Sequence, residues 1–167
     1  YGGRPLGFIG TFFGVGHTTV DVSSNGNLNF SSDASFSNAL LPDGPARISP
    51  MWDDLYVYSN QSITESVSAG NYYAVTWRIG TFNFGHVFHQ FQVVWFGATQ
   101  TIRGFTFQPN DIAFCYESVG APPWDATAGL NAGDGANFVS IPGTPNGGIS
   151  DANAGLLPLY PSSHNVI

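Results

Sequence analysis

Apolar and polar residues alternate along several stretches of this chain, and that period of two limits the fold more than any other feature. In "HTTVDVSS", Val20 and Val22 share one face of an extended segment, while Thr19 and Asp21 share the other. "NYYAVTWRIG", "HVFHQFQVVWFG" and "NDIAFCYES" alternate likewise, with parts that are apolar on both faces, as in the middle of a sandwich. Because no stretch has a convincing helical period, the sequence predicts short strands.

Turn-forming residues separate these strands. The chain has 21 glycines and 11 prolines among 167 residues, a length that fits one domain with its own core. We predict an all-β fold, an antiparallel β-sandwich with Gly/Pro-rich loops and an extended C-terminal tail. The domain would comprise residues 1–141 and the tail residues 142–167, where the composition becomes loop-like. Four apolar tail residues favour docking, on the tail's own domain or on a neighbouring subunit, over free disorder: Leu156, Leu157, Leu159 and Tyr160.

The stretch "VDVSSNGNLNF" predicts a hairpin whose register follows from its apolar residues. A two-residue loop at "NG" would pair Val22 with Asn29 and mix apolar and polar side chains on one face. A three-residue loop at "SNG" pairs Val22 with Leu28 instead. We therefore expect the longer loop, with Gly26 in the left-handed conformation.

Charge is scarce in this chain. Only 9% of the residues are charged, against roughly 25% in ordinary domains, and the cations are four arginines without any lysine. The net charge of −7 argues against nucleic acid or an anionic membrane as a partner, because phosphate binding requires a basic patch. No apolar run approaches the roughly 20 residues of a membrane span. A protein surface with so few charged residues repels other proteins weakly and favours packing against them.

Asp53 and Asp54 in "ISPMWDDLYVY" form the most conspicuous acid pair. In an extended strand the two carboxylates point to opposite faces, so they cannot converge on a substrate. In a turn they could bind calcium, or accept hydrogen bonds from backbone N–H groups, which is the interpretation we favour. "NAGDGAN", around Asp134, is the nearest second cluster, but no stretch fits a calcium-binding loop. We expect no cofactor, with structural calcium at the acid pair as the alternative.

Catalytic motifs are absent from the sequence. No nucleophile elbow or phosphate-binding loop occurs, and Cys115 in "IAFCY" is expected to be a buried, unreactive thiol. The histidines are spaced poorly for a metal site: His17, His86, His89 and His164. We therefore predict that the protein is not an enzyme.

Three residues are candidates for modification or surface contact. The sequons "NFS" and "NQS" make Asn29 and Asn60 candidate glycosylation sites. Trp124 in "APPWDAT" is the best candidate for an exposed ring that stacks on a sugar or on another subunit.

Six segments follow one another in a familiar order. They are "VSSNGNLNF", "ISPMWDDL", "YYAVTWRIG", "FQVVWFG", "NDIAFCYESV" and "ATAGLNAGDGANF". Together they resemble the nidogen-like (NIDO) extracellular domain, especially the versions in bacterial secreted and surface proteins. The resemblance covers roughly Leu6 to Val139 and implies a β-rich extracellular module for adhesion or matrix assembly, without enzymatic activity. The aromatic segment "FNFGHVF" and the tail after residue 141 depart from this pattern.

The sequence thus predicts a non-enzymatic structural or adhesion module, secreted or at the cell surface, that acts through protein–protein contact. Its partners would be copies of itself, in a matrix or filament, or other extracellular matrix proteins. An extended tail can add a strand to an exposed sheet edge of the next subunit. The alternative is a carbohydrate-binding β-sandwich module with glycans as partners, bound by exposed aromatic rings.

Overall fold

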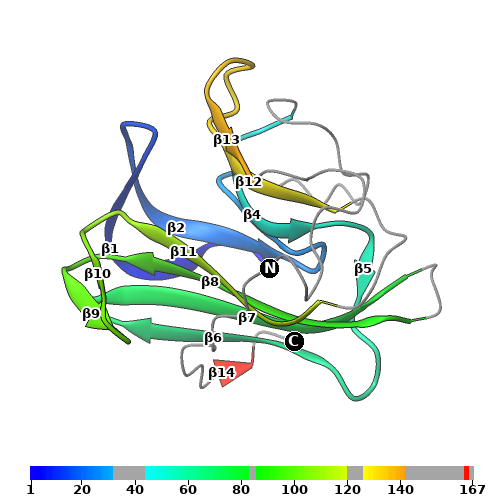
Figure 1. The fold of residues 1–167 in the computed structure, drawn as a ribbon. Coiled ribbons are helices and arrows are strands. Elements are labelled where there is room, and N and C mark those ends of the chain that lie inside the picture. The colour runs from blue at the N-terminus through cyan, green and yellow to red at the C-terminus, as the bar shows by residue number, and fades with distance from the viewer. Residues whose placement is uncertain (32–43, 83–85, 120–125, 142–163, 166–167) are drawn as a thin grey trace.

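The computed structural model describes residues 1–31, 44–82, 86–119 and 126–141, and the backbone of residues 164 and 165 (Figure 1). These residues form antiparallel strands and contain no helix, which confirms the all-β prediction. Two six-stranded sheets form the two layers of a sandwich (Figure 1). The described part of the chain accordingly has no helix that could cross a membrane.

The first sheet has the strand order β1-β2-β3-β4-β12-β13. Its strands are β1 (Arg4–Phe12), β2 (Val15–Ser23), β3 (Asn27–Asn29), β4 (Arg47–Trp52), β12 (Thr127–Asn131) and β13 (Phe138–Ser140). The second sheet has the order β11-β8-β7-β6-β14, with β5 beside β7. Its strands are β5 (Leu55–Tyr56), β6 (Ser62–Ser68), β7 (Tyr72–Thr81), β8 (Phe88–Phe96), β11 (Ile112–Val119) and β14 (His164–Asn165). A separate hairpin consists of β9 (Gln100–Ile102) and β10 (Phe105–Phe107).

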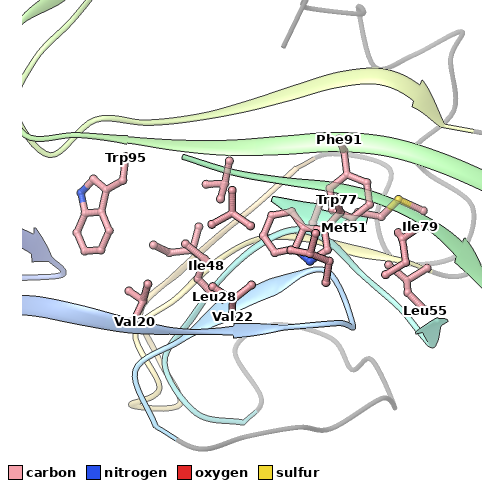
Figure 2. Packing of buried hydrophobic residues seen from close by; sticks show 14 of the residues in the cluster. Val20, Val22, Leu28, Ile48, Met51, Leu55, Trp77, Ile79, Phe91 and Trp95 are labelled. Atoms are coloured by element: carbon pink, nitrogen blue, oxygen red, sulfur yellow. The ribbon is translucent and has the colours of Figure 1, made fainter. Parts of the chain in front are cut away.

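The core lies between the two sheets and is built from side chains that the alternation assigns to shared faces. Val20 and Val22 enter it from β2, and Trp77 enters it from β7 (Figure 2). Trp77 stacks on Phe91 of β8, with ring centroids 5.3 Å apart. Arg78, the next residue of β7, is exposed on the opposite face. Each large apolar side chain buried here stabilises the fold by about 1.5–3 kcal/mol.

Tyr116 connects the two sheets. It lies in the core on the same face of β11 as Ile112 and Phe114, as the alternation predicts. Its hydroxyl donates a hydrogen bond to the carbonyl oxygen of Pro50 in β4, at 2.6 Å. This bond fixes the part of β4 that leads into the acid pair. Cys115, which lies between Phe114 and Tyr116 in the sequence, points to the outer face of the second sheet.

The hairpin between β2 and β3 has the predicted register. Val22 pairs with Leu28 and Ser23 with Asn27, so the loop has three residues. Gly26 ends this loop with a φ of 74°, which confirms the left-handed glycine. A Cβ atom at this position would collide with the carbonyl oxygen of Met51. The hairpin therefore packs its backbone directly against β4.

The β9–β10 hairpin folds over the outer face of the second sheet. Phe107 stacks on Phe96 with ring centroids 4.4 Å apart and planes 8° apart. Phe96 belongs to a small apolar cluster that includes Cys115, against which Phe107 packs. This contact anchors the base of the hairpin, while its turn remains at the surface.

Strand β14 covers part of one sheet edge. His164 pairs with Glu65 and Asn165 with Thr64 of β6, in antiparallel orientation. The end of the tail thus adds a strand to its own domain, one of the two placements that the sequence leaves open. The apolar tail residues Leu156, Leu157, Leu159 and Tyr160 lie outside the described residues, and the boundary at residue 141 stays a prediction.

Candidate functional site

The acid pair lies where the chain passes from the first sheet to the second. Strand β4 ends at Trp52 and β5 begins at Leu55, so Asp53 and Asp54 occupy the bend between them rather than a continuous strand. The Asp53 carboxylate accepts a hydrogen bond from the Asp54 N–H at 2.7 Å. This contact is the one expected of a carboxylate that stabilises a turn.

Asn25 holds this crossover in place. Its backbone carbonyl accepts the N–H of Asp53 at 3.3 Å, and its side-chain oxygen accepts the N–H of Leu55 at 3.3 Å. The carbonyl of Asp54 in turn accepts the N–H of Phe82 at 3.0 Å. These contacts give the acid pair a structural role, while calcium binding by Asp53 and Asp54 stays a prediction.

The β1–β2 and β12–β13 hairpins project from the first sheet (Figure 1). Residues of both line a groove of about 520 Å³. The β1–β2 hairpin contributes Phe12, Phe13 and Val15, and the β12–β13 turn contributes Asp134 and Asn137. The groove therefore has an apolar wall on one side and a polar wall with a carboxylate on the other.

Hydrogen bonds within the β12–β13 turn hold Asp134 rigidly. One carboxylate oxygen accepts the N–H groups of Ala136 and Asn137 at 2.9 and 2.8 Å, and the other accepts the Asn137 side-chain amide at 2.6 Å. These donors lower the pKa of Asp134 to about 2, so the groove carries a fixed negative charge at any physiological pH.

Asn131 attaches the turn to the segment just before β4. Its side-chain oxygen accepts the N–H of Gly133 at 3.0 Å, and its amide donates to the carbonyls of Gly44 and Pro45 at 3.3 and 3.4 Å. Of the residues in "NAGDGAN", Asp134 and Asn137 thus come together at the groove, whereas Asn131 is buried and does not line it. Neither the sequence nor its spacing predicted this groove.

The second distinctive surface is the edge at β6. Arg4 of β1 forms an ion pair with Glu65 of β6, and its Nε lies 3.0 Å from a Glu65 oxygen. The Tyr73 hydroxyl donates to the same oxygen at 3.2 Å. The hydrogen bond to Glu65 raises the pKa of Arg4, and burial near this carboxylate raises the pKa of Tyr73. The side chain of Glu65 therefore faces inward, while its backbone pairs with β14.

Comparison with protein families identifies the domain. A family model described as NIDO related matches residues 2–154, most of the chain. The chain belongs to this family. Comparisons with curated proteins and with solved structures give no match. Membership confirms the nidogen-like resemblance and makes this an extracellular-type domain with a β-rich fold.

The three histidines of this NIDO-related domain whose side chains the structure describes do not gather at one point. His17 lines the groove and packs against Phe30 with ring centroids 4.0 Å apart and planes tilted by 36°, and burial lowers its pKa. His86 packs against Tyr58, and His89 is buried in β8. Within the described ranges, no three His, Cys, Asp or Glu side chains lie together where they could hold a metal ion.

The remaining predicted sites of the domain differ in accessibility. Asn29 is 1% exposed, whereas Asn60 is exposed in the turn before β6, so Asn60 is the sequon that presents its amide to solvent. Cys115 is buried, and burial raises the pKa of its thiol to about 11, as expected of an unreactive cysteine. Trp124 lies outside the described residues.

Proposed function

We propose that this NIDO-related domain is a non-enzymatic, extracellular structural module that assembles with copies of itself into a matrix or filament. Family membership supports the extracellular setting. The observation that carries the proposal is the pairing of β14 with β6, because a sheet edge that accepts a strand from its own tail can accept one from a neighbour's tail.

Strand exchange of this kind fits the composition of the chain. Backbone hydrogen bonds join two β-strands without requiring charged side chains, and this chain has few. A tail that leaves one subunit and pairs with the next makes a head-to-tail contact, which produces open fibres rather than closed dimers.

Removing the tail tests the proposal. Deletion from Asp151 onward is expected to leave a folded but monomeric domain, which sedimentation velocity and electron microscopy at neutral pH would detect. A second variant keeps the full length but carries His164→Pro and Asn165→Pro, because proline cannot donate a backbone hydrogen bond. It should lose assembly as the deletion does. Assembly by the deletion variant at the wild-type concentration would show that strand exchange is wrong.

Carbohydrate binding is the second candidate function. It is favoured by the groove, where the exposed ring of Phe13 lies opposite Asp134 and Asn137, a combination of ring and polar groups that suits a sugar. A glycan array tests it, with Asp134→Asn and Trp124→Ala as variants. Carbohydrate binding would be favoured over self-assembly if the wild-type monomer and the tail-deletion variant bound the same defined glycans. One of the two substitutions should then abolish this binding.

A further inference from the structure

The tip of the β9–β10 hairpin combines an exposed cation with an exposed aromatic ring. Arg103 and Gly104 form a two-residue turn in which both have positive φ, 52° and 85°, the geometry of a tight hairpin. Phe105, the next residue, is 60% exposed. A hydrogen bond between the hydroxyls of Thr101 and Thr106 at 3.1 Å and the stacking of the base on Phe96 keep this tip rigid.

Among the four arginines, Arg103 is the one best placed to meet another molecule. Arg4 is in the ion pair with Glu65, and the Arg47 guanidinium is buried over the Trp52 ring, 3.8 Å from its centroid. Arg78 is exposed, but it lies in the middle of β7 rather than on a turn. Arg103 projects from the surface beside an apolar ring.

The groove between the β1–β2 hairpin and the β12–β13 turn has the complementary properties. Phe13 and Val15 are 43% and 58% exposed along one wall, which is a large apolar area to leave in water. The opposite wall holds the Asp134 carboxylate in a fixed position. An arginine beside an aromatic ring matches this pairing of a carboxylate with an apolar wall.

We propose that the β9–β10 tip of one copy docks in this groove of a second copy, with Arg103 against Asp134 and Phe105 against Phe13 and Val15. The inference rests on the proposed self-assembly and adds a second contact to the exchanged strand. The tip lies over the outer face of the second sheet and the groove at the first sheet, so the two surfaces differ, and a contact made in one direction is head-to-tail.

A hairpin tip in a groove of this size buries far less than the roughly 1,000 Å² that a stable interface needs, so it cannot hold subunits together alone. It acts through avidity, since the strand contact brings tip and groove to a high effective concentration. Loss of the tip contact should therefore raise the concentration required for assembly by on the order of tenfold, and loss of the tail should abolish assembly.

Charge exchange between two variants tests the pairing. Arg103→Glu gives a copy whose tip is repelled by the groove of its own kind, and Val15→Arg with Asp134→Asn gives a copy whose groove repels the wild-type tip. Each should assemble only at raised concentration. An equimolar mixture should assemble at close to the wild-type concentration, because each tip then meets a groove of opposite charge. Light scattering and electron microscopy give the readout.

Arg78→Glu is the matched control, since it changes the net charge by the same amount at a site away from the tip. It should assemble as wild type does. If Arg103→Glu assembles as readily as Arg78→Glu, or if its defect is not rescued in the mixture, the tip–groove contact is wrong while self-assembly stands. If wild-type protein fails to assemble at any concentration, the proposed function fails as well. Arg103 is exposed, so the first comparison holds even if the groove variant folds poorly.

Discussion

Arg4 and Glu65 form an ion pair that joins β1, the first strand of one sheet, to β6 of the other. The Glu65 side chain is nine-tenths buried, whereas about a third of the Arg4 side chain reaches solvent. The pair therefore closes the sandwich along the side where β1 and β6 approach each other, and it lies directly beneath the backbone that receives β14.

Replacing Arg4 should destabilise the fold, because it leaves a buried carboxylate without its cation. We expect Arg4→Met to lower the free energy of unfolding by about 1–3 kcal/mol, less than for a fully buried pair because Arg4 is partly solvated. The double variant Arg4→Met with Glu65→Met should regain most of this loss. Urea denaturation measures both, and a loss below about 0.5 kcal/mol in the single variant would contradict the role given to the pair.

Gly26 should tolerate no side chain. Gly26→Ala combines a left-handed backbone with a collision against the Met51 carbonyl, so it should cost at least about 3 kcal/mol. Gly70→Ala is the matched control, because Gly70 has a φ of 76° but open space around the added atom. It should cost only about 1–2 kcal/mol. Equal thermal shifts for the two variants would rule out the close packing of this loop on β4.

Tyr116→Phe tests the bond between the sheets. The variant keeps the buried ring but leaves the Pro50 carbonyl without its donor, which should cost about 1–3 kcal/mol of unfolding free energy. Tyr56→Phe, at an exposed position, should change stability by less than about 0.5 kcal/mol. Chemical denaturation measures the unfolding free energy of both variants. If Tyr116→Phe is as stable as wild type, the hydrogen bond to Pro50 does not hold β4 in place.

Cys115 should react slowly with thiol reagents in the native protein. Burial raises its pKa from 9.0 to about 11, so the thiolate fraction at pH 8 falls by on the order of 100-fold, and access is restricted as well. The rate should rise to that of a free cysteine in denaturant. Ser59→Cys with Cys115→Ala places the thiol on an exposed turn and should react rapidly in native protein. Rapid native labelling of Cys115 would contradict its burial.

The alternation of apolar and polar residues and the turn-forming residues were enough to predict strand faces, one hairpin register and the burial of single side chains. The face of β7 that contains Trp77, the register of Val22 with Leu28 and the burial of Cys115 all depend on neighbours in sequence, and all are confirmed. Asp53 and Asp54 were harder to place, because β4 ends at Trp52 and the chain changes sheets there. No local sequence pattern indicates that the chain passes from one sheet to the other at this point.

The groove was out of reach of sequence reasoning for a related reason. Asp134 and Asn137 lie in one short turn, and their hydrogen bonds are local. Phe13 and Val15, which complete the groove, come from a hairpin more than a hundred positions earlier in the chain, and only the order of strands in the first sheet brings the two together. Contacts of such long range depend on topology, which residue spacing does not encode.

Under the proposed strand exchange, the antiparallel match of His164 and Asn165 with β6 makes each subunit's own tail a competitor for the edge that a neighbour's tail would use. A strand supplied from within the same chain is always close at hand, so dilute subunits would keep their edges covered and stay apart. Crowding at the place of secretion would shift the balance towards neighbours. In the proposed assembly, the pairing of each tail with its own β6 would therefore delay polymerisation until the chains are concentrated outside the cell.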